Sequence, residues 1–248
     1  MVHIIIEGNI GVGKTSLLEA MKETYGSSVK VFPEPVKKVQ CCAGENLLSL
    51  MYNDPKRWSF TFQKAIALAM MKIHMEARKT TDAHTVTERS IFGTKIVFVE
   101  HLKNKGLITK MEHWLLEDEF NFYVTQLKVN PDIIVYLRAP PEVCLKRIQE
   151  RGRPEEKKIT LDYLKGLHDL HERWLAPSCN HCHNDISASK NVIVIDANQS
   201  KSQMLTQLRS FEEKLFSAHL TGHLKVNKHV NPMMSDHKDE QFEGEKAI

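Results

Sequence analysis

The residues best suited to chemistry form a glycine-rich run near the start of the chain. Gly8, Asn9, Ile10, Gly11, Val12, Gly13, Lys14 and Thr15 fit the pattern G-x-x-x-x-G-K-[ST]. In that pattern backbone N–H groups surround phosphates, the lysine reaches the β- and γ-phosphates, and the hydroxyl ligates Mg²⁺. A chance match in an ordinary glycine turn would lack the flanking elements. Here residues 3–7 predict a buried strand and residues 16–22 a helix, whose N-terminus favours anions. The run therefore predicts a nucleoside triphosphate site.

Two acidic residues and one arginine are candidates for work on the transferred phosphate. Glu34 follows a predicted strand at residues 29–32 and could accept a proton from a hydroxyl that attacks the γ-phosphate. A solvated loop glutamate is the alternative for this residue alone. Glu88 and Arg89 end a second predicted strand. Glu88 could hold Mg²⁺ through water and Arg89 could grip an oxygen, although a structural ion pair is an equal alternative.

Three arginines follow the predicted strand at residues 132–137. Arg147 and Arg151 are four residues apart, so they share a helix face, and Arg153 follows Gly152, where that helix should end. Guanidinium groups on one mobile element suit a lid that closes over the transferring phosphoryl group. Most arginine runs are solvated helix faces, but the glycine-rich run favours the lid here.

Strands and helices alternate along the chain. The predicted strands are residues 3–7, 29–32, 85–87, 132–137 and 191–196. The predicted helices are residues 16–22, 47–51, 58–78, 92–101, 110–128, 141–149, 161–175 and 204–216. This order predicts an α/β fold with a mainly parallel central sheet flanked by helices, and its ligands should bind beyond the carboxyl ends of the strands. We expect one domain over residues 1–216 and a mobile tail over 217–248, where the apolar periodicity stops.

Composition limits the remaining classes of function. The 248 residues carry 34 basic and 31 acidic side chains, a balance that does not favour nucleic acid as a partner. No apolar run approaches the roughly 18 residues that span a membrane, and a strand starting at residue 3 leaves no room for a targeting peptide. An odd number of cysteines predicts free thiols in a cytoplasmic or other reducing compartment. Residues 179–183, Cys-Asn-His-Cys-His, are interpreted as an ordinary loop because their spacing is too tight for one tetrahedral metal.

Seven segments together resemble the deoxyribonucleoside kinase family, which includes the insect multisubstrate enzyme, mitochondrial thymidine kinase and deoxycytidine kinase. They are EGNIGVGKTS (7–16), EPV (34–36), NLLSLMY (46–52), DPKRWSFTFQ (54–63), ERSIF (88–92), YLRAPPEVCLKRIQERGRPEE (136–156) and LHDLHERWL (167–175). The resemblance implies a P-loop kinase fold with an arginine-rich lid, ATP as phosphate donor and Mg²⁺ held by Thr15 and Glu88. It gives Glu34 the role of general base on the sugar 5′-hydroxyl, with Arg89 positioning that hydroxyl.

The resemblance also implies a deoxynucleoside pocket. Tyr52 and Glu156 match the pair that binds the sugar 3′-hydroxyl. Gln63 matches the amide that reads the base edge, Phe98 the ring that stacks on the base, and Phe62 a lining residue.

Three pocket positions bear on the choice of base. Met70 and Thr94 stand where deoxycytidine and deoxyguanosine kinases carry an arginine–aspartate pair, so these neutral side chains resemble the thymidine-accepting branch. Val39 stands where the insect enzyme has a tryptophan, which predicts a looser pocket wall.

The sequence thus predicts an ATP-dependent kinase that phosphorylates the 5′-hydroxyl of pyrimidine deoxynucleosides, thymidine first. A nucleoside monophosphate kinase is the alternative, and a non-catalytic nucleotide switch is a remote one because its Asp-x-x-Gly and Asn-Lys-x-Asp motifs are missing from suitable positions. The apolar helices at residues 58–78 and 92–101 carry more hydrophobic surface than one sheet face needs. Together with the resemblance, they predict a homodimer.

Overall fold

A parallel sheet forms the centre of the computed structural model, which describes residues 1–127, 129–176 and 191–216. Its described strands are β1 (His3–Gly8), β2 (Val29–Phe32), β3 (His84–Glu88), β4 (Ile133–Arg138) and β5 (Val192–Asp196). They lie in the order β2-β3-β1-β4-β5, and each neighbouring pair is parallel. The α/β fold with a parallel central sheet is therefore confirmed. The 179–183 cluster and the 217–248 tail lie outside the described residues.

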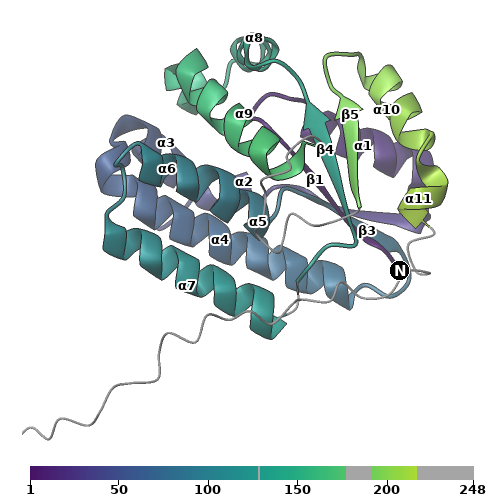
Figure 1. Ribbon diagram of the computed structural model, residues 1–248, viewed down its shortest axis with the longest axis horizontal. Coiled ribbons are helices and arrows are strands. Elements are labelled where there is room, and N and C mark those ends of the chain that lie inside the picture. The colour runs from purple at the N-terminus through teal and green to yellow at the C-terminus, as the bar shows by residue number, and fades with distance from the viewer. Residues whose placement is uncertain (128, 177–190, 217–248) are drawn as a thin grey trace, which may run out of the picture.

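Helices cover both faces of this sheet (Figure 1). The helices before β4 are α1 (Lys14–Tyr25), α2 (Val36–Val39), α3 (Leu47–Asn53), α4 (Pro55–Lys79), α5 (Ile91–Gly93), α6 (Glu100–Asn104) and α7 (Lys110–Leu127). Those after β4 are α8 (Pro141–Arg151), α9 (Leu161–Leu175), α10 (Lys201–Arg209) and α11 (Glu212–Phe216). Short 3₁₀ turns lie at η1 (Gly26–Ser28) and η3 (Pro154–Lys158), and a π-helical segment, η2 (Thr94–Val99), joins α5 to α6.

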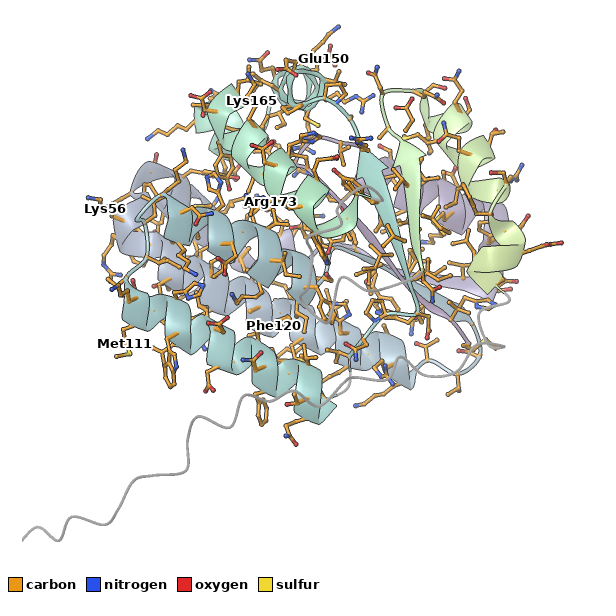
Figure 2. The ribbon with its side chains drawn as sticks, in the orientation of Figure 1. Lys56, Met111, Phe120, Glu150, Lys165 and Arg173 are labelled. Carbon is orange, nitrogen blue, oxygen red and sulfur yellow. The ribbon has the colours of Figure 1, made fainter. Side chains whose placement is uncertain are left out.

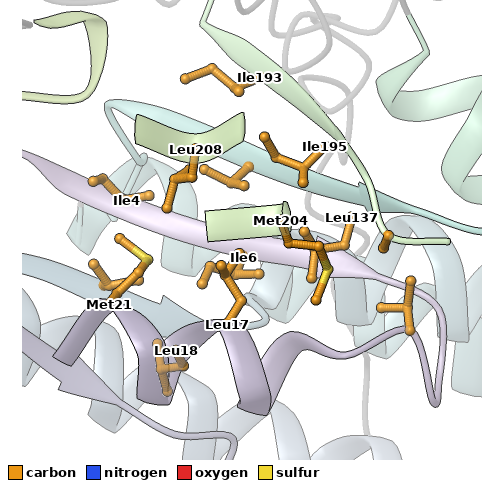
Figure 3. Close-up of a cluster of buried hydrophobic side chains, with 14 of the residues drawn as sticks. Ile4, Ile6, Leu17, Leu18, Met21, Leu137, Ile193, Ile195, Met204 and Leu208 are labelled. Carbon is orange, nitrogen blue, oxygen red and sulfur yellow. The ribbon is translucent and has the colours of Figure 1, made fainter. Parts of the chain in front are cut away.

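The alternation of side chains along β1 divides the core into two layers. Ile4 and Ile6 point to one face, where they pack with Leu17 of α1 and Leu208 of α10 (Figure 3). Ile5 points to the other face, into the cluster that α4, α5, α7 and α9 cover. Every β1 residue is buried, as a central parallel strand requires. This burial holds the carboxyl end of β1, and the loop that follows it, in a fixed place.

Two predicted helices differ from the structure. Residues 92–101 do not form one α-helix but run through α5, the π-helical η2 and the start of α6. Residues 204–216 are divided between α10, which ends at Arg209, and α11, which begins at Glu212. α10 also starts earlier than predicted, at Lys201, after a capping box made by Ser200 and Gln203.

One of the two segments expected to supply a dimer surface is buried in the structure. α4 keeps exposed apolar side chains, but Phe92 and Val97 in the 92–101 segment are fully buried. The other exposed apolar side chains in that part of the chain lie on α7, which packs beside α4.

Candidate active site

A cavity of about 1110 Å³ opens at the carboxyl edge of the sheet, between the glycine-rich loop, the end of β2, α3, α4, η2 and α8. A pocket for one small ligand has roughly 300–1,000 Å³, so this cavity has room for more than one. Predicted site residues that line it are Ile10, Gly11, Gly13, Lys14, Thr15, Glu34, Tyr52, Phe62, Gln63, Met70, Glu88, Arg89, Thr94, Phe98, Arg147, Arg151, Arg153 and Glu156. The structure thus gathers residues that are far apart in the sequence around one space.

The glycine-rich loop is packed tightly between β4 and α8. Gly8 and Gly11 have φ angles of 142° and 77°, which side chains rarely adopt. A Cβ on Gly8 would lie 2.5 Å from the Leu137 carbonyl oxygen, and one on Gly11 would lie 2.6 Å from that of Cys144. Asn9 does not line the cavity, because its amide donates to the Leu164 carbonyl of α9 at 2.9 Å. At Gly8 and Gly11 a side chain would therefore be strained by the positive φ and would also collide with the neighbouring backbone.

Lys14 lies inside this loop. Its Nζ donates to the carbonyl oxygens of Gly8 at 3.1 Å and Asn9 at 2.8 Å. Burial, together with the nearby charge of Arg89, lowers the pKa of Lys14 to about 8. Phosphate groups are stronger acceptors than these carbonyls, so an anion in the loop would offer this ammonium better partners.

Thr15 and Glu88 bring a hydroxyl and a carboxylate together at the mouth of the loop. Thr15 Oγ1 donates to Glu88 Oε1 at 2.7 Å, and Glu88 Oε2 accepts from the Glu34 N–H at 3.4 Å. Mg²⁺ prefers hard oxygen ligands and usually takes only one or two carboxylates beside water and phosphate. This donor set fits a magnesium ion bound with a triphosphate.

Arg89 and Glu34 form an ion pair beside the loop, with Nε and Oε1 3.1 Å apart. A second guanidinium nitrogen of Arg89 donates to the Gly8 carbonyl at 3.0 Å, and its guanidinium carbon lies 4.8 Å from the centre of the Phe98 ring. Burial opposes the charge of Arg89, but Glu34, Glu7 and Glu88 outweigh that effect and raise its pKa. The arrangement holds a carboxylate and a permanent cation at the boundary between the loop and the deeper cavity.

The deeper cavity is lined by α4 and η2. Gln63 is 3% exposed and its Oε1 has no hydrogen-bond partner among the described residues. Buried amides are usually satisfied, so this orphaned oxygen points to a missing polar ligand. Met70 and Thr94 line the same cavity, and the Thr94 hydroxyl donates to the Ser90 carbonyl at 3.0 Å. Phe62 and Phe98 supply aromatic surface.

Tyr52 and Glu156 lie on the side of the cavity formed by α3 and η3. Arg151 donates to both carboxylate oxygens of Glu156, at 2.9 and 2.7 Å, and Arg153 lies 3.4 Å from it. Burial, with smaller effects from Tyr163 and Glu156, raises the pKa of Tyr52 well above its usual value. The phenol is therefore protonated and able to donate a hydrogen bond at any physiological pH.

Comparison with known proteins decides the family. The family model for deoxynucleoside kinases matches residues 4–218. The chain belongs to the deoxynucleoside kinase family. Similar proteins include mitochondrial thymidine kinase 2 of Homo sapiens, 35% identical over 214 residues that cover 86% of this chain and 77% of that protein. A probable deoxycytidine kinase of Fowlpox virus (strain NVSL) is 32% identical over 216 residues, covering 86% and 89%. The mitochondrial deoxyguanosine kinase of Xenopus laevis is 36% identical over 194 residues, covering 70% and 72%.

Family membership makes this chain a phosphotransferase that acts on deoxynucleosides, a reaction of nucleoside salvage. No described helix is long and apolar enough to cross a membrane.

The three arginines of the predicted lid make contacts to nearby carbonyl and carboxylate oxygens in this kinase. Arg147 donates to the carbonyl oxygens of Val12 at 3.0 Å and Ala197 at 2.8 Å, so it braces the glycine-rich loop against the end of β5. Arg151 and Arg153 are paired with Glu156. All three arginines line the cavity, and the closing of a lid over the phosphoryl group stays a prediction. Arg151 and Arg153 remain candidates for contact with phosphate.

Sequence reasoning also missed part of the cavity of this kinase. Gln199, Ser200 and Lys201 line it beside the loop. Their place directly after β5, at the carboxyl edge of the sheet, was the available signal. Val39 packs in the core with Met70 and does not line the cavity, so the looser pocket wall expected from this small side chain stays a prediction. The neighbouring Lys38 and Gln40 line the cavity instead.

Proposed function

We propose that this kinase transfers the γ-phosphoryl group of ATP directly to the 5′-hydroxyl of a pyrimidine deoxynucleoside, with thymidine as the preferred acceptor. The observation that carries the proposal is the Glu34–Arg89 pair, which lines the same cavity as the phosphate loop and as Gln63, whose Oε1 has no hydrogen-bond partner among the described residues. A phosphate donor on one side and a base on the other would place the sugar hydroxyl beside this pair.

Each charged residue then has a role in the transfer. Glu34 accepts the proton of the attacking 5′-hydroxyl, and Arg89 orients that hydroxyl. Lys14 neutralises charge on the transferred group, together with Arg151 or Arg153 once Glu156 is shared with substrate. A magnesium ion held by Thr15 and Glu88 would neutralise the phosphates and orient them when it is bound.

The nucleoside roles follow from side chains in the deeper cavity. Tyr52 and Glu156 bind the 3′-hydroxyl, which favours deoxyribose. Gln63 reads the base edge, Phe98 stacks on the base and Phe62 packs beside it. Met70 and Thr94 are neutral and mainly buried, and the flexible thioether of Met70 can pack against the 5-methyl group of thymine. The similar proteins are named as kinases of thymidine, deoxycytidine and deoxyguanosine, so the preference for thymidine is supported here by the pocket side chains alone.

A direct assay tests this assignment. The purified chain is given ATP, Mg²⁺ and each of the four deoxynucleosides, with thymidine monophosphate as a fifth acceptor. We expect 5′-monophosphate products with the highest kcat/KM for thymidine. A higher kcat/KM for deoxycytidine would overturn the choice of base. Phosphorylation of the monophosphate, but of no nucleoside, would overturn the choice of acceptor and indicate a monophosphate kinase.

Glu34→Gln tests the general base. The amide keeps the size of the side chain but cannot take the proton, so kcat should fall about 10²- to 10⁴-fold while thymidine still binds. Steady-state kinetics and a thymidine binding titration measure the two effects. A variant with near-normal kcat would remove Glu34 from this role.

We further propose a homodimer, one catalytic domain over residues 1–216 and a reducing compartment. The apolar side chains exposed on α4 and α7 support the dimer. The described cysteines, Cys41, Cys42 and Cys144, are free, which supports the compartment.

A further inference from the structure

A second carboxylate lies behind the site rather than in it. Glu7 of β1 is completely buried and does not line the cavity. Its Oε1 accepts the hydroxyl of Ser90 at 2.5 Å, whereas its Oε2 has no hydrogen-bond partner among the described residues. Burial raises the pKa of Glu7 to about 7. Burying a carboxyl group with one oxygen unpaired is unfavourable, so its place in the fold requires an explanation.

The fold reserves space for this carboxyl group. Gly93 is in the helical region with a φ of −59°, so its backbone does not need glycine. A Cβ on Gly93 would lie 2.6 and 2.7 Å from the two carboxylate oxygens of Glu7. Glycine at this position is therefore explained by the carboxyl group packed against the first turn of α5.

Ser90 links Glu7 to that helix. Its Oγ accepts from the Gly93 N–H at 3.0 Å, as the N-cap of α5, and donates its proton to Glu7. Because a hydroxyl has one proton, donation to Glu7 leaves its lone pairs for the helix N–H. Glu7 thus orients the cap at the residue that follows Arg89.

The cap matters because Arg89 has a left-handed backbone. Its φ is 64°, a conformation that costs a non-glycine residue about 1–2 kcal/mol and persists only where the surroundings impose it. Its N–H donates to the Ile6 carbonyl at 2.9 Å. Ser90 donates to Glu7, and the Ile91 N–H donates to His74 Nε2 at 3.4 Å. Three successive residues are thus tied to β1 and α4.

We propose that Glu7 is a positioning residue: through Ser90 it holds the left-handed turn that presents the Arg89 guanidinium to Glu34 and to the acceptor hydroxyl. This inference rests on the role proposed above for Arg89. The charges of Arg89 and Lys14 act on Glu7 favourably, and that of Glu34 acts unfavourably. Glu7 and Glu34 both favour the charge of Arg89, and of the two only Glu34 lines the cavity.

The test compares variants that keep or lose the bond to Ser90. Glu7→Leu and Ser90→Ala remove this hydrogen bond, whereas Glu7→Gln keeps an acceptor oxygen on a side chain of the same length. Because misplacing a reactive group by about 1 Å can cost on the order of 100-fold, we expect kcat to fall by that factor in the first two variants. We expect KM for thymidine to stay within about threefold, because the base and sugar contacts remain, and Glu7→Gln to keep kcat within about tenfold of wild type. The Glu7→Leu/Ser90→Ala double variant should be no slower than either single variant, since both remove one interaction.

Thr85→Val provides the matched control. Thr85 is a buried residue of β3, four positions before Arg89, and its Oγ1 lies 2.9 Å from His3 Nδ1, away from the cavity. This variant should lose stability but not kcat.

The proposal is overturned if a folded Glu7→Leu keeps its kcat, or if Thr85→Val loses as much kcat as Glu7→Leu does. If Glu7→Leu does not fold, Ser90→Ala decides by the same criterion. An Arg89→Ala variant with normal kcat would instead refute the proposed function.

Discussion

At the scale of single residues, Gln63 and Glu7 both bury an oxygen that has no described hydrogen-bond partner. Gln63 lines the cavity, so a ligand can complete its hydrogen bonds. Glu7 does not line the cavity, so a ligand bound there is not expected to reach its second oxygen. A substitution at Gln63 should therefore change substrate binding, whereas a substitution at Glu7 should change the free energy of unfolding.

Gln63→Leu should lower kcat/KM for thymidine about 10- to 100-fold, since the base edge would lose hydrogen bonds worth about 1–3 kcal/mol. The same variant should be as stable as wild type or more stable, because an unsatisfied buried amide is removed. Kinetics and urea unfolding measure the two effects. A destabilised variant with unchanged kcat/KM would show that the amide serves the fold instead.

Glu7 should make stability depend on pH. Its carboxyl has a pKa of about 7 in the fold and 4.5 as its ordinary value, so the folded state binds the extra proton between these values. The contribution of Glu7 is then complete below about pH 4.5 and is lost as the pH rises through 7. One pKa unit corresponds to about 1.4 kcal/mol, so the loss is on the order of 3 kcal/mol. The free energy of unfolding of Glu7→Gln, measured against that of wild type from pH 5 to 8, should lack this decline. Parallel pH curves would contradict the assignment.

At the scale of elements, the glycine-rich loop is shaped by what surrounds it. β4 lies against Gly8, α8 against Gly11, and the side chain of Arg147 holds the Val12 carbonyl. These contacts set the positions of the loop N–H groups before any phosphate arrives, and preorganisation of this kind lowers the cost of binding.

Gly11→Ala should disrupt the loop. The new Cβ would meet the Cys144 carbonyl oxygen at 2.6 Å and a side-chain carbon of Ile148 at 2.8 Å, so the loop must move away from α8. We expect KM for ATP to rise at least about tenfold, with a loss of stability above the 1–2 kcal/mol that positive φ alone costs. Gly26→Ala is the control, because its φ is 54° but nothing lies within 4 Å of the added atom. Equal effects in the two variants would mean that contact with α8 is unimportant.

At the scale of the whole molecule, the outer surface of α4 and α7 is unusually apolar. Large hydrophobic side chains exposed there are Leu68, Met75, Met111, Trp114, Leu115 and Phe122. Figure 2 shows Met111 on the outer side of α7. Exposed apolar surface shared by two adjacent helices is typical of a protein interface. Association of two copies through this surface would leave the cavity, at the carboxyl edge of the sheet, open.

Leu68→Glu combined with Leu115→Glu should therefore convert a dimer to a monomer, because a buried, unpaired charge is strongly unfavourable at an apolar interface. Light scattering coupled to size exclusion measures the mass. Phe211→Glu is the control, since Phe211 is also exposed but lies beside α11, away from α4 and α7. A wild-type chain that is already monomeric would contradict the proposal.

The sequence alone determined the class of fold and where the phosphate loop lies. The pattern of the loop, the buried strand before it and the alternation of strands and helices are local properties, so residues 29–32 and 161–175 were predicted with the bounds of β2 and α9. The position of Glu34, Glu88 and Arg89 at the cavity follows from the sequence as well, because residues that follow parallel strands meet at one edge of the sheet.

Only the tertiary structure decided how those residues are used. Arg147 holds the Val12 carbonyl of the loop, Val39 lies in the core, and the π-helical η2 carries Thr94 and Phe98. None of these facts has a local signal, because each depends on which unpaired carbonyl or empty space the fold brings near a side chain. The hydrogen bond from Ser90 to Glu7 joins residues that are 83 positions apart in the sequence. They are neighbours only because β1 pairs with β3.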